Sequence, residues 1–255
     1  MNKYYFIGLL LNGPLLAMDR IQEDSDMERQ FSAVLSSGVI LQPSLEHAWG
    51  KDNLFSQRFY SLNSSSSLAA NVFDFETGLK LVKKRGELMD QASGGAMAAV
   101  LGLKAETIYS LLKAHHSINV TIANDNSYTQ IVISGLKQDI VHAQGLCEQA
   151  GAALVVPLNV GGAFHSPFMS PAQGQFETFL RDFQFNLPSL PIIANYTAKP
   201  YKTTETSNNL TQQITYPVRW AESIFYILAQ GETEFEEVGP GKVLTGLVQR
   251  IKNGQ

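Results

Sequence analysis

The sequence predicts an α/β protein whose main domain carries an inserted ferredoxin-like unit, and two patterns support this class. Between residues 97 and 160 the signals run strand, helix, strand, strand, helix, strand, which is the order of the ferredoxin-like βαββαβ fold. After that unit, helices with a single apolar stripe alternate with short apolar strands, as expected for helices packed on a mainly parallel sheet. We therefore expect a main domain over residues 1–95 and 162–255 and an inserted subdomain over residues 96–161.

The inserted unit is predicted from its apolar spacing. Apolar runs of strand length occupy residues 97–103, 118–122, 129–133 and 153–160. Helical spacing covers residues 104–115 and 137–151, the second with a glycine, Gly151, where a C-cap belongs. A cluster of turn-forming residues at 124–127 separates the second and third strands, so we expect these two strands to form a hairpin.

The main domain shows three helices with one buried side. Their apolar residues recur at helical offsets over residues 176–183, 220–228 and 244–251. Short strands are predicted at residues 192–196 and 234–238. Residues 22–70 show no clear period, and the only element expected there is a helix that ends near Leu35.

The composition is that of a folded protein with a large core. Of the 255 residues, 44% are hydrophobic and 16% are charged, which excludes disorder as the main state. Nineteen Lys and Arg against 23 Asp and Glu give a net charge of −4 without a long basic run, so no nucleic-acid partner is expected. The single cysteine, Cys147, excludes an internal disulfide and favours a reducing, cytoplasmic location.

The first apolar run, residues 4–11, ends at an Asn-Gly-Pro turn. It is too short to cross a bilayer, so we expect no membrane partner. We predict a buried first strand followed by a turn. A signal peptide is the weaker alternative, because Lys3 precedes the run and the small Ala17 follows it.

Two basic side chains are the candidates for chemistry. His165 follows a predicted strand in the sequence Gly-Gly-Ala-Phe-His-Ser-Pro, and ligands bind at strand ends of α/β sheets. A helix-capping turn is the alternative explanation for that segment. Arg85 lies in a predicted helix beside Lys83 and Lys84, where a solvated basic face is favoured by spacing alone. The alternative is a two-pronged donor to a carboxylate.

Five ordered segments resemble one enzyme family. They are residues 94–103 (GGAMAAVLGL), 131–135 (IVISG), 162–167 (GAFHSP), 216–220 (YPVRW) and 237–247 (EVGPGKVLTGL). Over residues 74–251 the chain resembles the malonyl-coenzyme A:acyl carrier protein transacylases. The resemblance implies a hydrolase-like α/β domain with a ferredoxin-like insert.

The resemblance also implies a reaction and its residues. A serine takes the malonyl group from coenzyme A and passes it to the phosphopantetheine thiol of an acyl carrier protein, in fatty-acid or polyketide biosynthesis. His165 would be the general base and acid, and Arg85 would bind the malonyl carboxylate. Gln213 would belong to the active-site network, and Phe164 suits a malonyl-selective motif. No metal or prosthetic group is implied, and malonyl-coenzyme A enters as substrate.

The N-terminal part departs from the family pattern, so residues 1–70 are diverged or shortened. Members carry Gly-His-Ser-Leu-Gly-Glu around the nucleophile, whereas residues 58–63 read Arg-Phe-Tyr-Ser-Leu-Asn. With a one-residue deletion Ser61 takes the nucleophile position, and without it Tyr60 does. The family's Gly-Gln-Gly-Ser-Gln loop, which helps to form the oxyanion hole, has no counterpart. Two alternatives therefore stay open beside the transacylase: an impaired relative that binds or assembles with carrier protein, and an acyl-carrier hydrolase.

Overall fold

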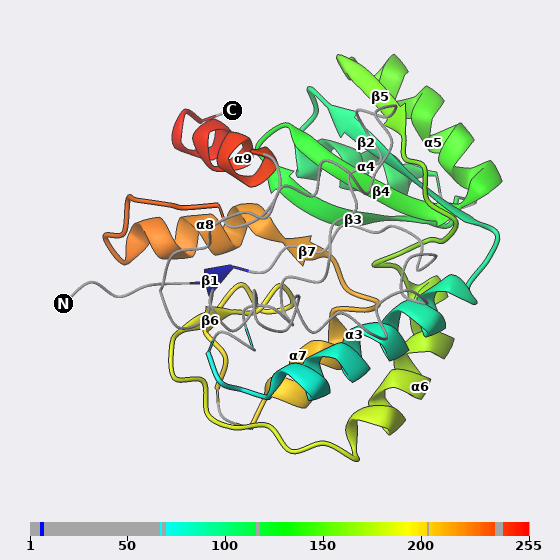
Figure 1. Cartoon of the computed structure of the whole chain (residues 1–255). Coiled ribbons are helices and arrows are strands. Elements are labelled where there is room, and N and C mark those ends of the chain that lie inside the picture. The colour runs from blue at the N-terminus through cyan, green and yellow to red at the C-terminus, as the bar shows by residue number, and fades with distance from the viewer. Residues whose placement is uncertain are drawn as a thin grey trace, which may run out of the picture.

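The computed structural model describes residues 6–7, 67, 70–115, 118–202, 204–237 and 242–254 (Figure 1). The described strands form a five-stranded sheet and a two-stranded sheet, with helices packed against them. The α/β class predicted from the sequence is therefore confirmed. The predicted helix near Leu35 and the predicted nucleophile Ser61 lie outside the described residues.

The six elements predicted between residues 97 and 160 occur in that order. They are β2 (Gly95–Leu101), α4 (Ala105–Ala114), β3 (Val120–Ser127), β4 (Gln130–Leu136), α5 (Lys137–Gln149) and β5 (Leu154–Pro157). We call this segment the βαββαβ unit. Its strands lie in the order β5-β2-β4-β3, and each neighbouring pair is antiparallel. The two helices pack on the sheet through an apolar core that includes Ile108, Ile131, Ile133 and Ile140.

The turn predicted at residues 124–127 is wrong, because these residues lie inside β3 and the turn falls at Tyr128 and Thr129. β3 is paired on both sides, antiparallel with β4 and parallel with β7 (Val218–Arg219). Asn124 pairs with Val132 on one side and with Val218 on the other, and register shifts in β3 flank it. Ladder pairing on two edges therefore outweighs the local turn preference of the polar residues.

The remaining elements lie outside this unit. In the described residues they are β1 (Phe6–Ile7), α3 (Phe75–Asp90), a 3₁₀ turn η3 (Pro167–Met169), α6 (Ser170–Leu180), β6 (Ile192–Ile193), α7 (Thr206–Gln212), β7, α8 (Trp220–Ala229) and α9 (Val243–Lys252). β1 lies in the first apolar run and pairs parallel with β6. Figure 1 shows α3, α6 and α7 on one side of the molecule and the βαββαβ unit on the other, with β7 joined to β3.

The three helices predicted from apolar stripes are present as α6, α8 and α9. The strand predicted at residues 234–238 is wrong, because residues 234–237 form no strand. The segment instead brings the Glu237 carboxylate to the start of α9, where it accepts hydrogen bonds from Leu244 N at 3.2 Å and Thr245 N at 2.9 Å. A carboxylate at a helix N-terminus satisfies free amides and interacts favourably with the helix dipole.

Candidate active site

His165 lies in a tight loop that packs against the first residue of β2. Gly95 is required there, because a Cβ on this residue would come within 2.0 Å of Ala163 N. His165 itself has φ of 56°, in the left-handed region, where histidine is more common than most residues. The next residue, Ser166, caps the η3 turn by accepting a hydrogen bond from Phe168 N. The capping role suggested for this segment therefore belongs to Ser166, and His165 is 1% exposed.

The imidazole of His165 is fixed by two main-chain carbonyls. Nδ1 lies 2.8 Å from the Gln213 carbonyl oxygen and 3.2 Å from the Tyr216 carbonyl oxygen. Because a carbonyl only accepts, Nδ1 carries the proton in the neutral ring, and Nε2 carries the lone pair. Nε2 is buried and has no hydrogen-bond partner among the described residues. This is the state in which histidine acts as a general base.

Arg85 lies on the buried face of α3, so the solvated basic face favoured by spacing is wrong. The helix begins after Asp74, whose carboxylate accepts a hydrogen bond from Thr77 N at 2.8 Å. Gly78, Leu81, Arg85, Leu88 and Met89 form its buried stripe. Arg85 is 8% exposed, and its Nε and Nη2 atoms have no hydrogen-bond partner among the described residues. A buried guanidinium with unpaired donors can bind a carboxylate through charge-assisted hydrogen bonds.

The positive charge of Arg85 disfavours protonation of His165. Burial and, to a smaller extent, the positive charge of Arg85 lower the pKa of His165 to about 4, while the two carbonyl hydrogen bonds oppose the shift. Burial also lowers the pKa of Arg85 to about 10, so its guanidinium stays charged at neutral pH. The structure therefore combines a neutral imidazole and a neighbouring buried cation.

The other predicted site residues lie around this pair. Gln213 follows the last residue of α7, is 1% exposed and supplies the main-chain carbonyl nearest to His165 Nδ1. Phe164 is buried in the core that also contains Leu88 and Met97. The nucleophile Ser61 lies outside the described residues. His165 and Gln213 are thus in direct contact, and the charge of Arg85 acts on His165.

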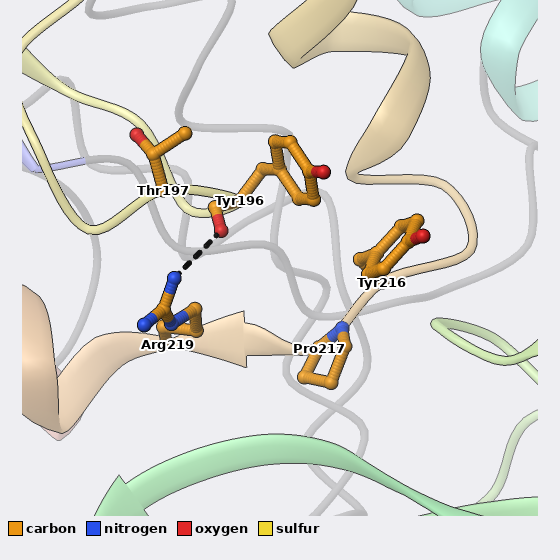
Figure 2. Close-up of a pocket in the computed structure, with 5 residues that line it drawn as sticks. All are labelled: Tyr196, Thr197, Tyr216, Pro217 and Arg219. Atoms are coloured by element: carbon orange, nitrogen blue, oxygen red, sulfur yellow. Dashed lines mark hydrogen bonds between the residues drawn. The ribbon is translucent and has the colours of Figure 1, made fainter.

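Sequence reasoning missed the role of Tyr216. Its carbonyl is the second acceptor for His165, and a main-chain group leaves no signal in the residue type. The Tyr216 ring forms one wall of a surface hollow of about 440 Å³, which is also lined by Tyr196, Thr197, Pro217 and Arg219 (Figure 2). This hollow lies beside the segment that holds His165 Nδ1.

Within the described part of the chain, no group of three or more His, Cys, Asp or Glu side chains is arranged to hold a metal ion. None of the described helices is long and apolar enough to cross a membrane.

Comparisons with known proteins agree on one family. Residues 63–253 match the acyl transferase domain family. The polyketide biosynthesis malonyl CoA-acyl carrier protein transacylase PksC of Bacillus subtilis is 51% identical over 195 residues, which cover 76% of this chain and 68% of the relative. The malonyl CoA-acyl carrier protein transacylase of Synechocystis is 41% identical over 193 residues, covering 75% of this chain and 64% of the relative.

Solved structures give the same result. The malonyl CoA-acyl carrier protein transacylase of Burkholderia pseudomallei superposes with a TM-score of 0.71 at 46% identity, covering 76% of this chain and 68% of the other. A malonyl-transacylase described in complex with its type II polyketide acyl carrier protein superposes with a TM-score of 0.72 at 36% identity, covering 75% and 64%. The chain belongs to the acyl transferase domain family and, within it, groups with the malonyl CoA-acyl carrier protein transacylases.

Proposed function

We propose that this chain transfers a malonyl group from a coenzyme A thioester to the phosphopantetheine thiol of an acyl carrier protein through a serine ester. The observation that carries the proposal is that Arg85 and His165 are both buried without a partner at Nε, Nη2 and Nε2 among the described residues, with the charge of Arg85 acting on His165. Malonyl thioesters present a carboxylate and an electrophilic carbonyl a few ångströms apart. The pair offers a cation for the first group and a neutral base beside the second.

In the first half-reaction the serine oxygen attacks the thioester carbonyl, and His165 Nε2 takes the hydroxyl proton. The carbon–sulfur bond then breaks, and the proton passes from Nε2 to the departing thiolate of coenzyme A. The products are free coenzyme A and a malonyl-serine ester. The carbonyls of Gln213 and Tyr216 hold the Nδ1 proton throughout, which keeps the lone pair on Nε2 directed at the reaction.

The second half-reaction is the reverse with a different thiol. His165 Nε2 takes the proton of the phosphopantetheine thiol, the thiolate attacks the ester carbonyl, and the serine oxygen leaves with that proton. Arg85 binds the malonyl carboxylate in both halves, which positions the carbonyl and selects for a diacid. The chain's own residues thus provide binding, orientation and proton transfer.

Binding of the carboxylate also changes the base. The charge of Arg85 lowers the pKa of His165, and a bound carboxylate would offset that charge. The pKa of His165 therefore rises towards its ordinary value when a malonyl group is present. A base with a pKa nearer the working pH accepts the serine proton more readily. A substrate whose carboxylate binds Arg85 therefore makes His165 a better base for its own transfer.

Ser61 is our predicted nucleophile. The family match begins at residue 63, after this serine, so the identity of the nucleophile rests on the sequence argument. The decisive experiment is intact-protein mass spectrometry after incubation with malonyl-coenzyme A. We expect one malonyl adduct on the wild-type chain, none on Ser61→Ala, and an unchanged adduct on Tyr60→Phe.

The outcomes separate the alternatives. No adduct on the wild-type chain, together with carrier-protein binding in a titration, would contradict the transferase and support an impaired binding module. Release of free malonate from a malonylated carrier protein, without an acceptor thiol, would indicate a hydrolase. An adduct that survives Ser61→Ala would assign the ester to another side chain.

The proposal extends to the domain architecture, the acceptor protein and the cellular location. We infer that the βαββαβ unit is a ferredoxin-like subdomain inserted over residues 96–161 in a hydrolase-like main domain. The relatives with 51% and 50% identity are named as polyketide biosynthesis proteins, which favours a polyketide carrier protein as acceptor. No metal or prosthetic group takes part, and a cytoplasmic location suits both thioester substrates. Comparing transfer rates to a polyketide and a fatty-acid carrier protein tests the choice of acceptor.

A further inference from the structure

We propose that Arg219 is a positioning residue for His165, acting through Tyr196 and Tyr216. The proposal goes beyond the binding and proton-transfer roles given above, and it rests on the proposed function only for its kinetic readout. It starts from the turn that supplies both acceptors of the Nδ1 proton, residues 213–216.

This turn is fixed at its first end by α7. Gln213 N donates to Asn209 O, and Tyr216 N donates to Gln212 O at 3.0 Å, so the turn continues the helix. Its other end leads through Pro217 into β7, which is only two residues long. The position of the Tyr216 carbonyl, 3.2 Å from His165 Nδ1, therefore depends on what holds this second end.

The second end is held by a brace that Figure 2 shows. Arg219 Nη1 donates to the Tyr196 carbonyl at 3.2 Å, the dashed line in Figure 2. Its Nη2 pairs with Glu222. Arg219 N donates to the Asn195 carbonyl at 3.4 Å. The Tyr196 ring packs against the Tyr216 ring edge to face, with centroids 4.8 Å apart. The contacts therefore run from Arg219 through Tyr196 to the residue whose carbonyl faces His165.

The brace is also attached to the βαββαβ unit. β7 pairs parallel with β3, where Arg219 lies opposite Asp125. The planar guanidinium makes its two contacts at once, which a lysine ammonium does not reproduce in the same geometry. Exposed ion pairs contribute little on their own, and both Arg219 and Glu222 are about two-fifths exposed. The hydrogen bond to the Tyr196 carbonyl is therefore the contact that matters.

The test replaces Arg219 and observes the imidazole of His165 directly. In the ¹⁵N-labelled full chain at neutral pH, we expect the His165 ring of the wild type to show a protonated Nδ1 and an unprotonated Nε2. In Arg219→Gln the Gln213 carbonyl still accepts from Nδ1, so we expect the tautomer to persist, and the chemical shifts of Nδ1 and its proton to change because the Tyr216 carbonyl moves. Arg219→Lys should lie between the wild type and Arg219→Gln, and it keeps the test usable if the glutamine variant folds poorly.

The matched control is Arg250→Gln. Arg250 also ties two distant elements together, because its Nη1 donates to Gln130 Oε1 at 2.7 Å, an interaction outside the 213–216 turn. We expect this variant to leave the chemical shifts of His165 Nδ1 and its proton unchanged. In malonyl transfer, Arg219→Gln should lower kcat about 10- to 100-fold and change KM less than about twofold, as expected for a misplaced base.

Two results would overturn the proposal. One is an Nδ1 and ring proton that keep their wild-type chemical shifts in Arg219→Gln. The other is an equal change in Arg250→Gln, which would indicate general loosening. If the chain transfers no malonyl group at all, the proposed function fails, but the ¹⁵N spectra still decide the role of Arg219.

Discussion

The core of the βαββαβ unit and the core around His165 differ in the kind of side chain that they bury. The first is a cluster of apolar side chains with Cys147, contributed by both helices and all four strands. The second places a guanidinium, an imidazole and a carboxamide, from Arg85, His165 and Gln213, at similar depth. Burial of apolar groups stabilises the fold, whereas burial of a charge without a partner costs stability. The first core therefore stabilises the fold. The second loses stability by burying a charge, in a position where that charge can bind substrate.

The largest effect on activity is expected from a change at His165. Replacing His165 by Gln removes the base and leaves a side chain of similar volume. We expect malonyl transfer to fall on the order of 10⁴-fold or more, because loss of a catalytic base has effects of this size in hydrolases. The melting temperature should stay within a few degrees of the wild type. A loss of less than tenfold in kcat would mean that another group accepts the proton.

In the βαββαβ unit the largest expected effect is on stability. Ile131 is fully buried in β4, so Ile131→Ala leaves a cavity in an apolar core. We expect the free energy of unfolding to fall by about 2–5 kcal/mol, measured by urea denaturation. The kcat of the folded fraction should stay near the wild-type value, since this side chain lies outside the site. A large change in kcat at full folding would show that the two cores are coupled.

Arg85→Met should lower activity without lowering stability, the opposite of Ile131→Ala. The variant keeps an elongated side chain and removes a buried charge, so we expect the free energy of unfolding to rise by about 1 kcal/mol or stay unchanged. The kcat/KM for malonyl-coenzyme A should fall about 100-fold, because a charge-assisted bidentate contact is lost. Acetyl-coenzyme A has no carboxylate and should lose little. An equal loss for both thioesters would remove Arg85 from carboxylate binding.

The smallest effect is expected where the two regions meet, at Asp125. Burial raises the pKa of this carboxyl to about 6, with help from Glu106 and Glu222 and against Arg219. A raised pKa means that ionisation costs stability, so stability falls as pH rises from about 4 through 6. Asp125→Asn should therefore stabilise the chain by about 1–2 kcal/mol at pH 8, allowing for its partial exposure.

The gain from Asp125→Asn should disappear near pH 4, where the wild-type carboxyl is neutral. Asp182→Asn, at an exposed carboxyl, is the matched control and should show no such pH dependence. A gain that is equal at pH 4 and pH 8 would show that the effect does not come from ionisation.

The sequence predicted the βαββαβ unit better than the site. Its strands and helices keep periods of two and 3.6 residues because they bury one face, and that is what apolar spacing records. Asn124 misled the turn assignment because pairing of β3 on two sides is a tertiary effect. Arg85 looked exposed beside Lys83 and Lys84, since spacing of charged residues does not show which one faces inward.

Within the candidate site, His165 was predicted from its place after an apolar strand, and the resemblance supplied the roles proposed for Arg85 and Gln213. The contribution of Tyr216 was beyond prediction, because it uses a carbonyl that every residue has. The contacts of Arg219 with Tyr196 and Glu222 depend on how β7 meets the turn after β6, which no local pattern records.

We propose that Arg85 and His165 share one buried site, in which the guanidinium charge lowers the pKa of the imidazole. The most direct measurement is the NMR titration of the His165 imidazole in Arg85→Met, with Lys83→Met as the control from the exposed side of the same helix. In the wild type His165 should titrate near pH 4, and removal of the Arg85 charge should raise its midpoint while Lys83→Met leaves it in place. A midpoint that is the same in all three proteins would contradict the shared site.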